Sequence, residues 1–156
     1  MKKSLLFIPR IVSLIVFSLL LVQCSKDDDE PVKTPAEQIL GNWQLTGVNY
    51  SPAYDLGTGT PVTDGFVYYS VCEKDDITMF KVNSQGEFNE GLTKCDPSDE
   101  QIIPFLYTLT DNNTKLNISA LAEFNIVQLD NTTMKLSTTF SENGTNYTET
   151  FTFTRK

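Results

Sequence analysis

The residues able to do chemistry in this chain are its carboxylates and cysteines, because none of the 156 residues is a histidine. Without an imidazole, no Ser-His or Cys-His pair can activate a nucleophile. The acidic pairs Asp75-Asp76 and Asp99-Glu100 are adjacent in sequence. Adjacent residues of a strand point to opposite faces, so neither pair forms an acid–base dyad. No glycine-rich phosphate loop is present either, and we therefore expect neither an enzyme nor a cofactor.

Three cysteines, Cys24, Cys72 and Cys95, are the remaining reactive side chains. Two cysteines without histidine do not complete a tetrahedral zinc site. The nearby acids lack the spacing of a calcium-binding loop, so we expect no metal site. If Cys24 carries a lipid, as argued below, the other two lie in a compartment where disulfides persist. One Cys72–Cys95 disulfide then leaves no free thiol; the alternative is two separate buried thiols.

The amino-terminal residues have the pattern of an export signal. Lys2, Lys3 and Arg10 form a basic start, and residues 11–22 are apolar apart from two serines. This apolar run of about 12 residues is shorter than the roughly 20 that a membrane-spanning helix needs. A basic start, a short apolar core and a cleavage site together mark a signal peptide. The sequence predicts one over residues 1–23; the alternative is a retained amino-terminal anchor.

The end of the apolar run resembles the lipobox of bacterial lipoproteins. Leu21-Val22-Gln23-Cys24 places a cysteine directly after apolar residues, although Gln23 departs from the Gly, Ala or Ser usual there. The resemblance implies cleavage before Cys24 by signal peptidase II and attachment of a palmitate-bearing lipid to its thiol. It implies anchoring to the outer membrane, on its periplasmic face or at the cell surface. The acidic stretch 25–30 also resembles a signal for export to the outer face; the alternative is a solvated spacer.

Residues 24–39 are predicted to be a lipidated, flexible, acidic tether. Residues 25–36 hold four consecutive acids, two prolines and little apolar surface, so folding would not offset the entropy lost on ordering them. Removal of the signal peptide leaves 9 of the 12 basic residues against 20 acidic ones, a net charge of −11. Such a polyanion repels nucleic acid, and we exclude a nucleic-acid partner.

Residues 40–156 have the pattern of one all-β domain. Apolar residues alternate with period two between turn residues, and no helical period is sustained. The predicted strands are residues 43–48, 77–82, 87–92, 105–110, 115–119, 123–129, 133–140 and 147–154. Residues 51–65 are predicted to form a loop, and 66–71 are left unassigned. About eight strands in simple succession predict a single antiparallel up-and-down β-barrel, whose closure removes exposed edges. We expect a monomer.

The last two predicted strands indicate which side chains face the interior. Pairing Phe140 with Tyr147 places apolar residues opposite one another, while the threonines of residues 148–154 face solvent. This pairing also places Thr138 opposite Glu149. A carboxylate on the apolar side is costly unless it is hydrogen-bonded, bound to ligand or near the open end; the simplest interpretation puts Glu149 at the rim. The predicted ligand-binding residues are Leu136, Thr138, Tyr147, Glu149 and Phe151.

Three segments resemble the lipocalin-like domains of secreted Gram-negative lipoproteins. Leu40-Gly41-Asn42-Trp43-Gln44-Leu45 looks like their Gly-x-Trp opening, the run from Cys72 to Cys95 is the most specific match, and Tyr147-Thr148 with Phe151-Thr152 fits their last strand. The resemblance implies a barrel from Leu40 to the end. The resemblance implies the fold more than an activity. The aromatic residues predicted to face the interior favour binding of a small apolar or amphipathic ligand. The alternative is a cell-envelope interaction, inhibitor or accessory protein that uses its rim loops without a small-molecule ligand.

The lipobox resemblance predicts that Cys24→Ala abolishes incorporation of radioactive fatty acid and retention in the membrane fraction, because the acceptor thiol is lost. Globomycin, which blocks signal peptidase II, should stop the processing of the unmodified chain. Ser25→Ala is the matched control and should label normally. Unchanged labelling of the Cys24→Ala protein would contradict the assignment.

Overall fold

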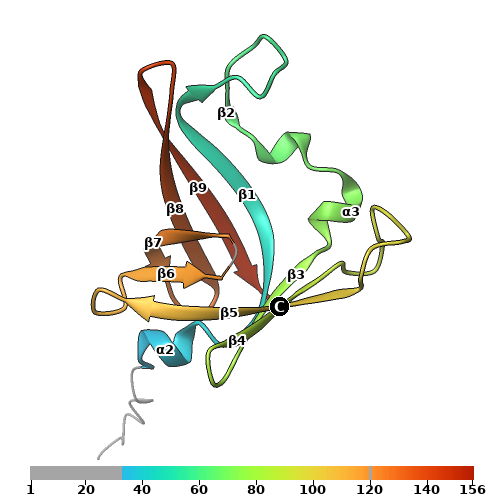
Figure 1. Ribbon diagram of the computed structural model, residues 1–156, viewed down its shortest axis with the longest axis vertical. Coiled ribbons are helices and arrows are strands. Elements are labelled where there is room, and N and C mark those ends of the chain that lie inside the picture. The colour runs from blue at the N-terminus through green and yellow to red at the C-terminus, as the bar shows by residue number, and fades with distance from the viewer. Residues whose placement is uncertain (1–32, 120) are drawn as a thin grey trace, which may run out of the picture. The chain divides into compact units, whose positions relative to one another are not determined.

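The folded unit is built of strands that follow one another along the chain (Figure 1). The computed structural model describes residues 33–119 and 121–156, so the predicted signal peptide 1–23 and the predicted lipidation site Cys24 lie outside the described residues. The strands are β1 (Gly41–Tyr54), β2 (Val62–Asp64), β3 (Ile77–Lys81), β4 (Gln85–Asn89), β5 (Ile102–Thr110), β6 (Lys115–Ile118), β7 (Ala122–Leu129), β8 (Thr133–Glu142) and β9 (Thr145–Arg155). The helical segments are α2 (Pro35–Gln38), the 3-10 helix η1 (Phe66–Tyr68) and α3 (Val71–Lys74). None of the helices in this part of the chain has the length and apolar character that crossing a membrane requires.

Strand β1 closes the sheet into a barrel because it pairs along both of its edges. Residues 41–44 pair with β3, and residues 43–51 pair with β9. From β3 to β9, each strand pairs antiparallel with the next along the chain. The result is a closed eight-stranded up-and-down barrel, which confirms the predicted fold. β2 is an additional strand that pairs only with the far part of β1.

The register of the last hairpin is the one that the alternation predicts. The pairs are Phe140 with Tyr147, Leu136 with Phe151, and Thr138 with Glu149. The turn explains why: Asn143 and Gly144 have φ of 51° and 80°, as a type I′ hairpin turn requires. A tight turn leaves one pairing between the strands, and a slip by one residue would turn every apolar side chain outward.

The predicted loop over residues 51–65 is wrong in part. β1 continues to Tyr54, and Val62–Asp64 form β2. The Tyr54 ring packs against Phe140 and Tyr147, with ring centroids 5.0 and 4.9 Å apart. These partners lie far away in sequence, so they override the local Gly, Pro and Thr content that favours a loop. The unassigned residues 66–71 form η1 and the start of α3.

One end of the barrel is closed by Trp43 and Arg155. The Trp43 side chain is fully buried, and its Nε1 donates a hydrogen bond to the Ile39 carbonyl at 2.7 Å. The Arg155 guanidinium lies 4.2 Å from the centroid of the Trp43 ring, a cation–π contact. It also donates to the backbone carbonyls of Gln38, Leu40 and Asn131. These carbonyl oxygens stabilise the positive charge of Arg155. Through them the last strand is bonded to the first residues of the folded unit.

The last residues of the predicted tether belong to this closed end. The sequence predicts a tether over residues 24–39, but Pro35–Gln38 form α2, with a capping box between Thr34 and Glu37. Ile39 is fully buried in the core together with Trp43. Burying its side chain contributes roughly 1.5–3 kcal/mol, which offsets part of the entropy lost when the helical turn beside it is ordered. The folded unit therefore starts before residue 40.

Candidate functional site

The barrel interior is hollow. A cavity of about 540 Å³ lies between the strands, within the roughly 300–1,000 Å³ typical of small-molecule sites. The buried side chains of Phe80, Met134 and Leu136 form its floor, and the exposed residues Glu73 and Leu121 lie at its mouth. The floor rests on the closed end, because Trp43 and Phe80 share one buried core. The cavity is therefore open towards α3 and the long connections and shut at the other end.

Four of the five predicted ligand-binding residues line this cavity. They are Leu136, Thr138, Glu149 and Phe151. Tyr147 does not line it, and its ring instead stacks on Phe140 with centroids 5.3 Å apart. Alternation along the strand predicts which face of the sheet Tyr147 occupies, but not how far along the barrel axis it lies. The residue lies beyond the mouth, near the hairpin turn between β8 and β9. The role of the four lining residues in binding stays a prediction.

A comparison with known protein families decides the identity of this barrel. The family model for the lipocalin-like domain matches residues 39–136, which run from the closed end through both disulfide cysteines into β8. The chain belongs to the lipocalin-like domain family. This confirms the lipocalin-like part of the predicted resemblance over residues 39–136. No curated protein matches the chain.

Acidic side chains surround the mouth of the lipocalin-like cavity. Glu73, Asp76, Glu90 and Glu149 all line it. Burial, followed by the charges of Glu90, Asp75 and Glu73, raises the pKa of Asp76 to about 6. One oxygen of Asp76, Oδ1, is buried without a hydrogen-bond partner among the described residues. Asp76 is therefore the carboxylate least satisfied by the protein itself.

Two of the other acids of the mouth, Glu73 and Glu149, have hydrogen-bond partners in the protein. Glu73 accepts hydrogen bonds from the Ser70 backbone nitrogen and Oγ, both at 2.7 Å, and these bonds lower its pKa. Glu149 accepts a hydrogen bond from the Tyr50 hydroxyl at 2.8 Å. Burial and this bond raise the pKa of Tyr50. Glu149 is therefore hydrogen-bonded as well as close to the mouth. Among the described residues, no three Cys, Asp or Glu side chains gather so as to hold a metal ion.

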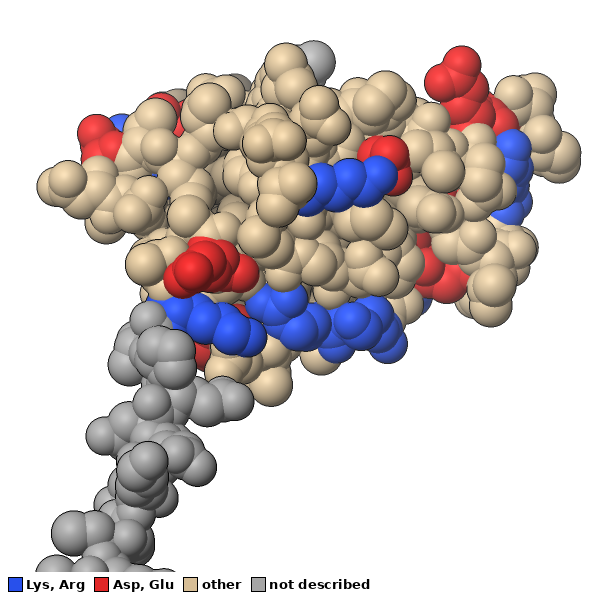
Figure 2. All heavy atoms as spheres, turned by 90° about the horizontal axis from the view of Figure 1, so that it is seen from below, with Lys and Arg blue, Asp and Glu red and all other residues tan. Residues whose placement is uncertain are grey.

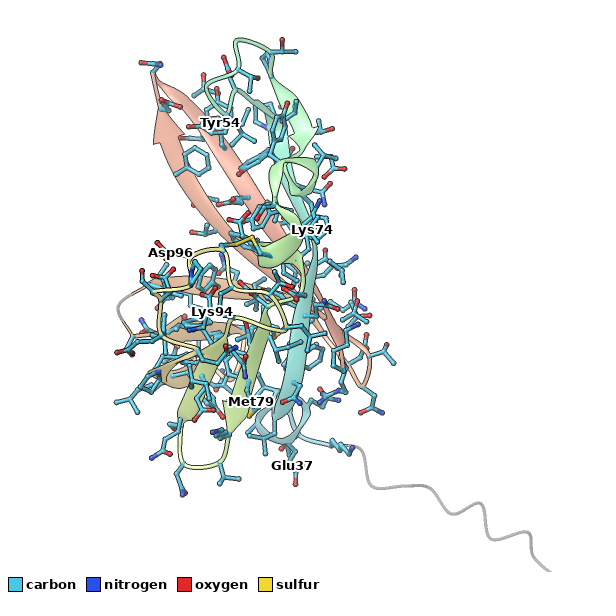
Figure 3. All side chains as sticks on the ribbon, turned by 90° about the vertical axis from the view of Figure 1, so that its right-hand side faces the viewer. Glu37, Tyr54, Lys74, Met79, Lys94 and Asp96 are labelled. Carbon is cyan, nitrogen blue, oxygen red and sulfur yellow. A yellow bond between two sulfur atoms is a disulfide. The ribbon has the colours of Figure 1, made fainter. Side chains whose placement is uncertain are left out.

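The predicted disulfide is confirmed and fastens the mouth (Figure 3). Cys72 in α3 and Cys95 in the β4–β5 connection are joined, with Cα atoms 5.3 Å apart. Asp75 ties the same two segments together, because its Oδ2 accepts hydrogen bonds from the Leu92 and Thr93 nitrogens at 3.0 and 3.1 Å. Without these links, a connection of this length would move freely over the cavity.

Sequence reasoning missed the part of the site that comes from β3 and β4. Asp76, Thr78 and Phe80 share one parity, as do Phe88 and Glu90 on the paired strand. Because Phe80 is buried, the same alternation used on β8 and β9 places Asp76 on the inner face. The signal was thus present in the sequence.

The raised pKa of Asp76 predicts a pH dependence of stability. Its ordinary pKa is near 3.8, so between about pH 4 and 6 the folded protein holds a proton that the unfolded chain releases. The free energy of unfolding therefore falls as pH rises through this window. Asp76→Asn removes the effect. After allowance for solvent screening we expect about 1 kcal/mol of added stability at pH 7.5, a rise in Tm of about 3–5 °C.

At pH 3, below both pKa values, Asp76 is mostly protonated in both states, and the same substitution should change Tm by less than about 1 °C. Asp99→Asn is the matched control, since it removes an equal charge from an exposed residue outside the cavity. Thermal unfolding followed by circular dichroism at the two pH values measures both effects. An equal shift for Asp76→Asn at both pH values would contradict the electrostatic cause.

Proposed function

We propose that the protein is a membrane-anchored lipoprotein whose lipocalin-like barrel binds a small apolar or amphipathic molecule. The observation that carries the binding proposal is the cavity of about 540 Å³. Small eight-stranded barrels are either filled by their own side chains or hollow enough for one ligand. A hollow interior with a mostly apolar wall favours the second of these uses.

The wall of the cavity supports an apolar ligand body. Phe88, Phe124 and Phe151 face the interior and yet are only partly buried. Removing apolar surface from water contributes roughly 25 cal/mol per Å², so a ligand that covers these rings gains free energy with no change of fold. A few polar groups at the mouth are then enough to orient it.

The anchoring part of the proposal rests on the sequence and on the disulfide. The basic and apolar pattern of residues 1–23 and the lipobox resemblance at Cys24 support export and lipid attachment at the outer membrane. The Cys72–Cys95 bridge supports an oxidising compartment outside the cytoplasm. A lipid anchor would hold the barrel beside a membrane, which is a reservoir of apolar molecules.

Exposed apolar side chains beside the mouth favour a second candidate function, namely interaction with a cell-envelope protein as an inhibitor or accessory subunit. Val71 is 83% exposed and Leu92 is 99% exposed. The segments that carry them are joined by the disulfide. Single exposed apolar residues are common on protein surfaces, however. The cavity is therefore the stronger of the two observations.

Binding of a neutral fluorescent probe tests the cavity directly. Because residues 33–156 form a compact unit of their own, a secreted form that starts at Ser25 carries the whole barrel without lipid. We expect it to bind N-phenyl-1-naphthylamine at one site with enhanced emission. Thr138→Trp places an indole inside the cavity and should weaken binding at least about tenfold. Thr139→Trp, on the exposed outer face of the same strand, should leave binding unchanged.

Circular dichroism of both variants checks that they fold. Equal binding by the two variants would place the probe outside the cavity and contradict the proposal. So would a complete lack of probe binding by the unmodified barrel, combined with a native mass spectrum that shows no co-purified small molecule.

A further inference from the structure

The polar part of the cavity lining carries charge of one sign. Four carboxylates, those of Glu73, Asp76, Glu90 and Glu149, are among the lining residues, and the described lining includes no lysine or arginine. They come from α3, from the residue before β3, from the residue after β4 and from β9. Acids from four separate segments thus converge on one opening. A single strand with a solvated, charged face would not produce this arrangement.

The nearby basic side chains are engaged elsewhere. Lys74 extends its Nζ over the Phe66 ring, 4.9 Å from the centroid, and Lys94 donates its Nζ to the Asp99 backbone carbonyl (Figure 3). Basic side chains gather instead at the opposite end of the barrel, in a row across the face seen from below (Figure 2). Lys74 contributes to the lowered pKa of Glu73, but no lysine or arginine is among the groups that shift the pKa of Asp76. The described residues therefore leave Asp76 without a positive neighbour.

The carboxylates of the mouth lie close enough to repel one another. The charges of Glu90, Asp75 and Glu73 all act on Asp76, in addition to its burial, and raise its pKa. Its Oδ1 is buried and lacks a hydrogen-bond partner among the described residues. A positive charge placed beside Asp76 would relieve both the repulsion and the missing hydrogen bond.

We propose that the ligand is a cationic amphiphile, with its apolar body on the phenylalanine wall and a protonated amine among Asp76, Glu90 and Glu149. This inference rests on the proposed function and specifies the ligand class of the same cavity. An ammonium group carries three donors and needs no fixed coordination geometry. It therefore suits acids that are not arranged as a metal site. An anionic amphiphile, such as a free fatty acid, would add a fifth negative charge to the opening.

The mouth and the floor take different parts of such a molecule. Phe80, Met134 and Leu136 are buried at the floor, where an amine would lose its hydration without gaining a partner. Asp76 and Glu90 lie at the open end, where the amine keeps contact with water. Glu149 is held in place by the Tyr50 hydroxyl, so it can accept a donor without first being ordered.

Three amphiphiles with the same alkyl chain test this inference on the secreted form that starts at Ser25. Dodecylamine, dodecanol and dodecanoate compete with N-phenyl-1-naphthylamine at pH 7.5 in low salt, below the concentrations at which they form micelles. We expect dodecylamine to displace the probe at a concentration at least about tenfold lower than dodecanol, and dodecanoate to be the weakest. Added salt should reduce the advantage of the amine because it screens the charges.

Substitution of the acids separates charge recognition from apolar binding. The double variant Asp76→Asn, Glu90→Gln should bind dodecanol as before and lose most of its preference for dodecylamine. Asp99→Asn, which removes an exposed charge away from the lining, should keep the preference. Glu73 is left unchanged because it caps α3.

The outcomes distinguish the two proposals. If the amine and the alcohol displace the probe equally, or if the double variant keeps the full preference, the cationic ligand class is wrong while the apolar cavity stands. If the probe binds and none of the three compounds displaces it, the ligand class is equally wrong. If the unmodified barrel binds neither the probe nor any of the three, the proposed function fails, and this inference fails with it.

Discussion

The structure depends on the double pairing of β1. One edge of this strand pairs with β3 and the other with β9, so the sheet has to curl until its first and last strands meet. Closure satisfies the backbone groups that would otherwise form an exposed edge. It also encloses a space whose width is set by the number of strands rather than by the side chains inside. The enclosed interior is thus a consequence of the double pairing of β1, and the side chains inside leave part of it open as the cavity.

The two ends of the barrel differ in structure: one end is closed by side chains and the other is the open mouth of the cavity. At one end, Trp43 and Arg155 stack and bind the backbone carbonyls around them, so that opening is filled. At the other end, α3 and the β4–β5 connection stand beside the mouth and are fastened by the disulfide and by Asp75. The cavity lining differs between the two ends in the same way: its buried apolar side chains form the floor, and its carboxylates lie at the mouth.

The sequence predicts the barrel and the final hairpin because both depend on short-range signals. Alternation with period two identifies the strands, and the Asn143-Gly144 turn fixes the register of β8 and β9. Tyr147 lies outside the cavity lining, which parity does not reveal, since parity defines a face of the sheet but not a depth in the barrel. β2 and the far half of β1 depend on partners that are distant in sequence. Whether the interior is hollow depends on how all eight strands tilt together, which no local pattern encodes.

Xenon binding tests most directly whether the barrel holds an open, apolar cavity. Xenon enters dry apolar cavities and scatters X-rays strongly, so crystals of the barrel under xenon pressure report on the interior without an assumed ligand. The account predicts xenon density inside the barrel, between Phe80, Phe124 and Leu136. A barrel whose side chains meet across the interior, with no xenon and no space for it, would contradict the account.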